Sequence, residues 1–358
     1  MASASPQSLK RGTLLCGGAY SIRALLGCGS FGAVYDAVDM RSGCGVALKT
    51  EALSAASPQL GIEWMALDRH LRYKEGIPRV IWFGPCEDAG VEVLVMQRLG
   101  ASVDALRAAV AAAGGDASAN IVAPLPLYVV QYIALQALER LQSCHEEWLA
   151  HRDLKPENLL FESGSVASVA ETLLAPTAAS DAAAAFAANT TPRAWPRVYL
   201  IDFGLCKMMR EADGRHIAVT RGKSLAGTPR YASLAAHRGL EQSRRDDLES
   251  LLYVLLHLAR GALPWQSEFM SAADAAAAAA EKVRRGGGGD GGGGDSAADD
   301  ADFSTIAAIK ARLTPREMCA GLPAAFEITL EHARNLAFDA MPDYALLSRA
   351  WRRSTKLR

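Results

Sequence analysis

The stretch HRDLKPENLL, residues 151–160, places three different polar groups close together along the chain. Asp153 supplies a carboxylate, Lys155 an ammonium two positions later, and Asn158 a carboxamide five positions later, directly before an apolar segment. A carboxylate can accept or orient a hydroxyl proton, an ammonium can neutralise a transferring phosphoryl group, and a carboxamide oxygen can bind Mg²⁺. The order therefore predicts a loop with phosphoryl-transfer chemistry.

The composition limits the classes of partner. The chain has 358 residues, 50% of them hydrophobic, and a formal net charge of −1, which gives no electrostatic reason to expect nucleic acid or an anionic membrane. The longest strongly apolar helical run, residues 251–259, is well short of the roughly 20 residues that a membrane span needs. Seven cysteines without a Cys-x-x-Cys pair indicate reduced thiols, and therefore a cytoplasmic or nuclear protein.

The hydrophobic pattern divides the chain into two parts. Residues 20–50 and 77–97 alternate in short apolar runs separated by Gly, Pro and Asp, which indicates strands and turns. Between them, one helix is predicted to start at Ser57 and end at Gly76. From residue 101 onward long helical periods dominate. The sequence therefore predicts an α+β fold in which a small β-rich lobe precedes a larger helical lobe.

Two tracts interrupt the helical part. Residues 163–194 are rich in Ala, Ser and Thr, and residues 272–304 contain an alanine run followed by a Gly/Asp-rich stretch. Residues 272–285 favour a helix on propensity alone, whereas residues 286–302 are typical of a flexible linker. We expect both tracts to be solvated insertions, because they appear too poor in large apolar side chains to pack on a core.

A glycine-rich stretch, GCGSFGAV at residues 27–34, lies between two predicted strands. Glycines allow a hairpin to bring its backbone close over phosphates, where a side chain would clash. In a dinucleotide-binding fingerprint the glycines would open a helix, but here they precede another strand. The position favours a nucleotide-covering hairpin over a Rossmann turn.

Three further charged residues fit the same chemistry. Lys49 ends a predicted strand and could bind the α- and β-phosphates of a nucleotide, with Glu63 of the next helix as its carboxylate partner. Asp202, in the sequence Ile-Asp-Phe-Gly, could chelate Mg²⁺ that bridges the phosphates. Each motif alone could be an ordinary charged loop, but all of them together in this order indicate a phosphotransferase.

The set resembles the eukaryotic protein kinases, in which HRDLKPEN is similar to the catalytic loop. The resemblance implies the bilobal kinase fold, ATP and Mg²⁺ as cofactors, protein substrates, catalytic roles for Asp153 and Lys155, and metal ligation by Asn158 and Asp202. A lysine two residues after the aspartate is the form of the serine/threonine kinases.

A closer resemblance is to the casein kinase I family. The segment GTPRYASLAAHRGLEQSRRDDLESLLYVLLHLARGALPWQ, residues 227–266, is similar to the family's GT-x-RYAS, EQSRRDDLES and GSLPWQ motifs. PQLGIEWM, IPRVIWFG, VLVMQRLGASVDAL and FDAMPDYALL also match in order, so that the similarity covers about residues 18–352 apart from the two tracts. Ser233, Leu234 and Ala235 stand where most kinases have Ala-Pro-Glu, and casein kinase I proteins lack that motif too.

The resemblance assigns further roles. Met96 would be the gatekeeper, Leu99 would offer backbone hydrogen bonds to adenine, Thr228 would brace the catalytic loop, and Asp247 would hold the backbone of His-Arg-Asp. The nucleotide site it implies comprises Leu26, Gly27, Cys28, Gly29, Ser30, Phe31, Gly32, Ala33, Val34, Ala47, Lys49, Met96, Gln97 and Leu99.

Four cations are expected to form a substrate-phosphate pocket. They are Arg152, Lys207, Lys223 and Arg230. In the casein kinase I family the equivalent pocket is linked to a preference for substrates that are acidic or already phosphorylated. A phosphate can engage several such cations at once through charge-assisted hydrogen bonds.

These expectations divide the chain into a tail (1–18), a kinase domain (19–352) and a C-terminal end (353–358). Within the kinase domain, the N-lobe is expected over about residues 19–98 and the C-lobe over about residues 99–352. We expect a monomer that acts on protein substrates. The alternative is a pseudokinase that serves as a nucleotide-binding scaffold, and the two differ in whether the catalytic residues are complete. Lys49, Glu63, Asp153, Asn158 and Asp202 are all present.

Overall fold

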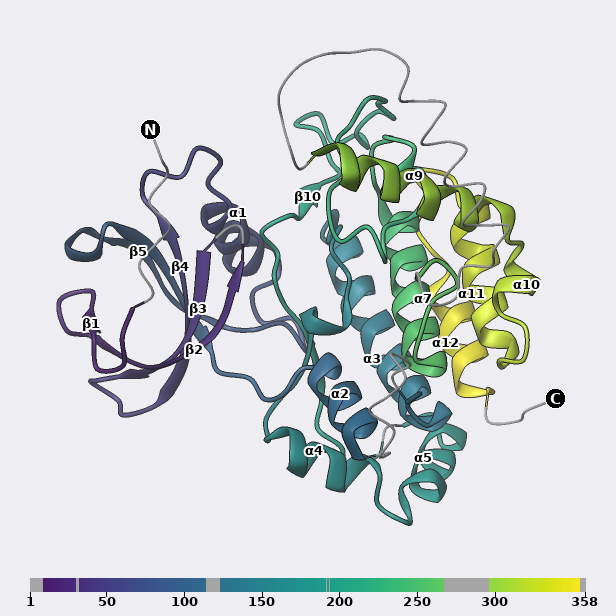
Figure 1. Ribbon diagram of the computed structural model, residues 1–358, viewed down its shortest axis with the longest axis horizontal. Coiled ribbons are helices and arrows are strands. Elements are labelled where there is room, and N and C mark those ends of the chain that lie inside the picture. Colours follow the sequence, from purple (N-terminus) through teal and green to yellow (C-terminus); the bar gives the residue numbers. More distant parts are fainter. Residues whose placement is uncertain are drawn as a thin grey trace.

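A computed structural model describes residues 9–29, 32–113, 123–190, 192, 194–266 and 296–354. Figure 1 shows a smaller lobe built around a sheet, connected to a larger lobe built from helices. The α+β, two-lobed arrangement predicted from the sequence is confirmed.

The small lobe contains an antiparallel sheet of six described strands in the order β1-β2-β3-β4-β6-β5. They are β1 (Leu14–Leu15), β2 (Tyr20–Gly29), β3 (Gly32–Asp39), β4 (Gly45–Ala52), β5 (Val80–Cys86) and β6 (Val91–Gln97). Alternate side chains such as Tyr35, Val46 and Leu48 fill the core of this lobe. The same alternation places Ala47 and Lys49 on the opposite face, which is turned toward the helical lobe.

The helix that follows the third long strand is shorter than predicted. It begins at Leu60 and ends at Met65 (α1), and one π-helical turn, Ala66–His70, continues it. Ser57 does not cap it. Instead, the Glu51 carboxylate at the end of β4 accepts hydrogen bonds from the backbone N–H groups of Gln59 (2.9 Å) and Leu60 (3.1 Å). A carboxylate stabilises the free N–H groups of a helix start, so the sheet itself holds α1 in place.

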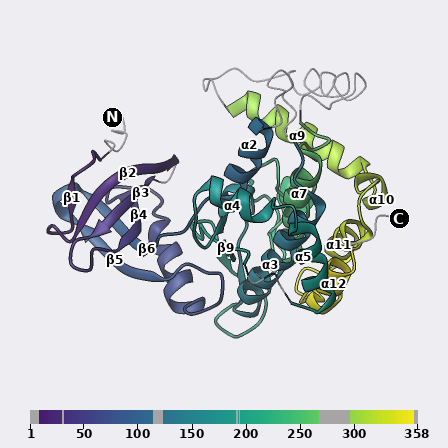
Figure 2. The same cartoon turned by 90° about the horizontal axis from the view of Figure 1, so that it is seen from below.

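The helical lobe is built around α3 (Leu127–Glu146) and α7 (Arg244–Arg260), whose residues are buried along most of their length. Figure 2, turned by 90°, shows other helices surrounding this pair. They include α2 (Val103–Ala113), α6 (Leu234–His237), α9 (Ser296–Arg312), α10 (Pro315–Met318), α11 (Ala324–Asn335) and α12 (Tyr344–Arg352). Short ladders pair β7 (Leu149–Ala150) with β10 (Lys207–Met208) and β8 (Leu159–Phe161) with β9 (Val198–Leu200). In the described part of the chain no helix is both long and apolar enough to cross a membrane.

The prediction that residues 163–194 are solvated is wrong. They form α4 (Val166–Leu173) and α5 (Ala178–Ala187), which pack on the main core through buried Val169, Leu173 and Phe186. These apolar residues recur at helical spacing, so each helix presents one apolar face although most of its residues are small. Composition concealed the periodicity that decides burial.

The second tract lies mostly outside the described residues, including the helix predicted over residues 272–285. Its last part is described: α9 begins at Ser296, inside the segment 286–302 that was predicted as a linker. The sequence SAADDAD combines alanines, which favour a helix, with acidic residues close to the helix start. The linker prediction is therefore wrong from Ser296 onward.

We predict that Phe186→Ala lowers the free energy of unfolding by about 3–5 kcal/mol, because it removes a large side chain that is 3% exposed from the core. The control Leu174→Ala, at a side chain 36% exposed between the same two helices, should cost less than about 1 kcal/mol. Denaturant unfolding of both variants makes the comparison. Equal, small losses would show that α5 does not belong to the core.

Candidate active site

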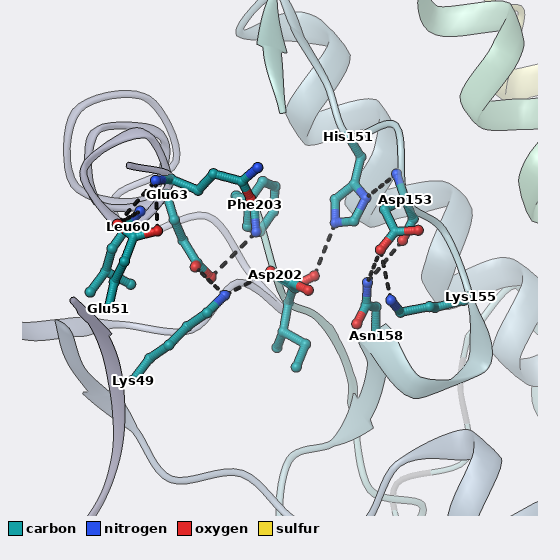
Figure 3. A network of polar contacts seen from close by, with 12 residues as sticks. Lys49, Glu51, Leu60, Glu63, His151, Asp153, Lys155, Asn158, Asp202 and Phe203 are labelled. Carbon is teal, nitrogen blue, oxygen red and sulfur yellow. Dashed lines mark hydrogen bonds and ion pairs between the residues drawn. The ribbon is translucent and has the colours of Figure 1, made fainter. Parts of the chain in front are cut away.

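The two lobes are joined by an ammonium shared between two carboxylates (Figure 3). The Nζ atom of Lys49 lies 2.6 Å from Glu63 Oε2 and 2.8 Å from Asp202 Oδ1. Glu63 also accepts a hydrogen bond from the backbone N–H of Phe203 (3.3 Å) through its other oxygen. The strand β4, the helix α1 and the loop after β9 therefore meet at one cation.

The charges in this group support one another. Burial works to lower the pKa of Lys49, but the carboxylates of Glu63 and Asp202 outweigh it and raise that pKa above its ordinary value. Burial also works to raise the pKa of Asp202, whereas the charge of Lys49 holds it below its ordinary value. The ammonium and the Asp202 carboxylate are thus both ionised at neutral pH.

The side chain of Asp153 is fixed from two sides, of which Figure 3 shows the side of Lys155 and Asn158. Its Oδ1 atom accepts hydrogen bonds from the backbone N–H (2.9 Å) and the hydroxyl (2.8 Å) of Thr228. Its Oδ2 atom accepts from Lys155 Nζ at 2.8 Å. The Asn158 amide donates to the Asp153 carbonyl (2.9 Å) through its nitrogen, so the oxygen of that amide is the atom suited to a cation.

His151 links this loop to the segment that carries Asp202. Its Nδ1 atom accepts from the backbone N–H of Asp153 (3.3 Å), and its Nε2 atom lies 3.0 Å from the Ile201 carbonyl. These two contacts assign the proton to Nε2, because only that nitrogen faces an acceptor. The ring also meets Phe203 edge-on at 4.9 Å between centroids. The two polar loops therefore pack as one unit.

A buried carboxylate holds the backbone of the Asp153 loop. Asp247, on α7, accepts hydrogen bonds from the N–H groups of His151 (2.7 Å) and Arg152 (2.8 Å), as the resemblance implied. Arg152 has a φ of 68°, an unfavourable conformation for a side-chain-bearing residue that the two bonds stabilise. Although burial acts to raise the pKa of Asp247, the bond from His145 and the backbone donors keep it below its ordinary value.

Sequence reasoning missed two residues of this anchor. His145 on α3 donates to Asp247 through Nε2 (3.0 Å), and its Nδ1 contacts the hydroxyl of Tyr344 on α12. Burial lowers the pKa of His145, so the ring is neutral and can donate at one nitrogen while accepting at the other. The only signal in the sequence was a histidine at the end of an apolar helix, which is not specific.

The sheet arranges part of the predicted nucleotide site in a row. Gly27, Val34 and Lys49 are successive cross-strand partners on one face, and Leu94, which the sequence did not assign to the site, continues the row. Because Gly27 has no side chain, the row is open on the side next to Val34. The sheet register also pairs Ala47 with Met96. The sheet register therefore brings Gly27, Val34, Ala47, Lys49 and Met96 close together.

Other residues of that predicted set are placed differently. Ala33 lies in the core on the opposite face of the sheet. Leu26 and Cys28 are exposed on β2, and the carbonyl of Leu99 accepts a hydrogen bond from the Arg98 guanidinium. Gly29 and Gly32 end β2 and begin β3, Gln97 ends β6, and Ser30 and Phe31 lie outside the described residues.

Three of the four predicted phosphate-binding cations surround one carboxylate. Glu241 Oε2 lies 2.7 Å from Lys207 Nζ and 3.4 Å from Lys223 Nζ. Burial lowers the pKa of Arg152, and the negative charge of Glu241 acts to raise it. Burial works to raise the pKa of Glu241, but the bond from Lys207 and the two ammonium charges hold it below its ordinary value. Arg230, the fourth predicted cation, forms no ion pair with Glu241 in the described part of the chain, and its charge acts on Tyr231 and His257.

The donor set suits Mg²⁺. Asp202 and Asn158 offer a carboxylate and a carboxamide oxygen, and among the described residues no group of three or more His, Cys, Asp or Glu side chains forms a closed metal cage. Mg²⁺ is usually held by one or two protein oxygens, with water and substrate phosphates completing the octahedron. The site fits a metal that arrives with a nucleotide.

A comparison with protein families gives one match. The family model described as the protein kinase domain matches residues 20–286, about three quarters of the chain. The match includes every residue of the ion-pair group and of the Asp153 loop.

A glycine next to the Asp153 loop provides a test of this geometry. A Cβ atom on Gly227 would lie 2.2 Å from the Arg152 carbonyl oxygen, whereas one on Gly222 would meet nothing within 4 Å. Both residues have positive φ, 89° and 73°, so Ala at either position carries the same kind of backbone strain. We predict that Gly222→Ala costs about 1 kcal/mol of stability and leaves turnover within about twofold.

Gly227→Ala should in addition lower turnover at least about tenfold, because the overlap displaces the loop that carries Asp153. Initial rates and thermal unfolding of both variants are the measurements. If the two variants retain the same turnover, the close approach does not position Asp153.

Proposed function

Because the chain belongs to the protein kinase family, we propose that it is a serine/threonine kinase of casein kinase I type that phosphorylates protein substrates. The observation that carries the proposal is the complete and connected set of Lys49, Glu63, Asp153, Asn158 and Asp202. A pseudokinase scaffold commonly lacks one or more of these groups, whereas here each side chain is in contact with its partner.

The residues divide the work between nucleotide and acceptor. Lys49, held by Glu63, binds the α- and β-phosphates of ATP. Mg²⁺ held by Asp202 and Asn158 would neutralise the phosphate charge when bound. Asp153, oriented by Thr228, accepts the proton of the acceptor hydroxyl. Positioning and fixed charge account for most of the rate in this chemistry, because the transferred group needs little covalent assistance.

Specificity for serine and threonine is supported by Lys155. Its ammonium contacts the same carboxylate that receives the acceptor hydroxyl, 2.8 Å away from Oδ2. A cation at this point stabilises the transferring phosphoryl group next to the attacking oxygen. This arrangement matches the loop form that the sequence shares with serine/threonine kinases.

The casein kinase I type is supported by motifs and by the cationic cluster. The segment at residues 227–266 carries the family's motifs on and around α7. Arg152, Lys207 and Lys223 outnumber the two carboxylates that act on them, those of Glu241 and Asp247, so the cluster has a net positive charge. Such a cluster favours acceptor segments that are acidic or already phosphorylated.

We predict that Lys49→Met and Asp202→Asn lower phosphoryl transfer at least about 100-fold while the protein remains folded, because each removes a charge that faces the phosphates. Lys74→Met is a matched control, since Lys74 also pairs with a glutamate (Glu147, 2.8 Å) but on the surface. The assay is radiolabel transfer to a serine peptide. Activity of either site variant within about tenfold of wild type, a barrier change of only about 1.4 kcal/mol, contradicts the mechanism.

Substrate choice can be tested with paired peptides. A peptide with phosphoserine three residues before the target serine should be phosphorylated about tenfold faster at low salt than its unphosphorylated twin. Lys223→Ala should reduce this preference, and so should added salt, because the cluster is partly solvated. Lys74→Ala, which removes a surface lysine that pairs with Glu147 (2.8 Å), is the control and should preserve it. Equal rates on both peptides for the wild-type protein would exclude selection by this cluster.

A further inference from the structure

Lys310, on α9, is a fully buried lysine (0% exposed) far along the chain from the motifs described above. Its ammonium donates to the carbonyl oxygens of Pro229 (3.0 Å) and Ala232 (2.7 Å). It also lies 3.1 Å from the His237 ring nitrogen Nε2. Burying an amine costs free energy unless its hydrogen bonds are made, so these contacts are a specific feature of the site.

The carbonyls that Lys310 binds belong to a tight turn at residues 228–232. The Thr228 carbonyl closes the turn by accepting from the N–H groups of Tyr231 (2.9 Å) and Ala232 (3.0 Å). A third carbonyl of the turn, that of Arg230, accepts from the indole N–H of Trp265 at 2.9 Å. Donors from two distant segments therefore hold three carbonyls of one turn.

Two aromatic rings complete the environment of the ammonium. Tyr253 and Trp265 each place their ring centroid 4.7 Å from Lys310 Nζ, and the two rings meet edge-on at 4.8 Å. In the described part of the chain no carboxylate lies within ion-pair distance of Lys310. Burial lowers the pKa of Lys310 well below its ordinary value, and the charge of Glu249 acts to raise it, but the carboxylate of Glu249 pairs with Arg334. The nitrogen of Lys310 can donate to the two carbonyls whether or not the amine is protonated.

The position of this lysine relates to a gap in the sequence. Most kinases have a glutamate at the position of Ala235. That glutamate forms an ion pair that fixes the segment to the helical lobe. Here the methyl group of Ala235 cannot form that pair. Ser233 caps the short helix α6 and donates to Asp246 (2.6 Å), but it does not reach the turn itself. The hydroxyl of Tyr231 attaches the turn to α7 through His257 (2.7 Å), whereas the backbone carbonyls of the turn are held by other donors.

We propose that Lys310 is the positioning residue that fixes the turn at residues 228–232, and with it Asp153, for the acceptor peptide. The first residue of the turn, Thr228, donates two hydrogen bonds to the Asp153 carboxylate. The Pro229 carbonyl is also contacted by His237 Nε2 (3.1 Å), so loss of the Lys310 donors releases the Ala232 carbonyl and leaves the Pro229 carbonyl with one contact, which loosens the turn from its far end. Figure 1 shows α9 along the upper edge of the helical lobe, and the bonds of Lys310 all go to residues 229–237 of that lobe, so they do not involve the strand and helix that hold the nucleotide side.

The test uses Lys310→Met, which retains the length and the ring contacts of the side chain but removes the donors. Arg260→Met is the matched control, because Arg260 also donates to two backbone carbonyls, of Met318 (2.8 Å) and Ala320 (2.7 Å), away from the turn. Trp265→Phe removes the bond to the Arg230 carbonyl and keeps an aromatic ring next to Lys310 and Tyr253. Each full-length variant is assayed for peptide KM and kcat, ATP Kd, and hydrogen exchange of residues 227–232.

Lys310→Met should raise the peptide KM and lower kcat, with kcat/KM reduced ~10- to 100-fold, while the ATP Kd stays within about twofold. Trp265→Phe should give the same pattern at about threefold, and it decides the question if Lys310→Met does not fold. Arg260→Met should leave both constants within about twofold even if it lowers the unfolding temperature. A merely structural role would lower the active fraction without changing KM.

Amide exchange in residues 227–232 should accelerate in Lys310→Met and not in Arg260→Met, since the bonds that close the turn open more often. This measurement does not require activity. The peptide assay rests on the proposed function, so a wild-type protein that phosphorylates no serine peptide refutes that function, while exchange still decides the role of Lys310. Unchanged exchange together with an unchanged peptide KM in Lys310→Met and Trp265→Phe would overturn the proposal.

Discussion

The ammonium of Lys49, shared between Glu63 and Asp202, is the interaction on which the arrangement of the lobes depends. It joins a strand of the small lobe, the helix beside it and a loop of the large lobe. Buried ion pairs contribute little net stability, because desolvation offsets most of the attraction. Such a pair forms only when its charged atoms lie at the right distance, however. At the junction of two lobes that close over a nucleotide, this requirement fixes the position of one lobe relative to the other.

The Asp153 loop depends on a second buried charge. Asp247 accepts from two consecutive backbone N–H groups and from His145, which in turn contacts Tyr344. Three helices of the large lobe thereby fix one short loop. Their combined hold stabilises the positive φ of Arg152, a conformation that few side-chain-bearing residues adopt without such support.

The two sides of the site are thus held by different parts of the fold. The nucleotide side rests on the sheet and on α1, whose start is itself fixed by Glu51 of β4. The acceptor side rests on α7 and, in our proposal, on Lys310 of α9. In this proposal, a substitution at Lys310 weakens peptide binding without changing ATP binding.

The sequence by itself determined the two-lobed α+β fold and the residues that form the ion-pair group, because the strand period and the short-range order of polar residues are local properties. Pairing of Lys49 with Glu63 followed from their places on a strand and the next helix. Composition misled for residues 163–194, where Val169, Leu173 and Phe186 pack on the core at helical spacing.

Only the tertiary structure decided which distant groups complete the site. Glu51 rather than Ser57 holds the start of α1, His145 and Tyr344 support Asp247, and Lys310 reaches a turn almost eighty residues earlier in the chain. Such contacts leave no pattern along the sequence, because a buried polar group needs a partner in space and the fold alone sets which one is near.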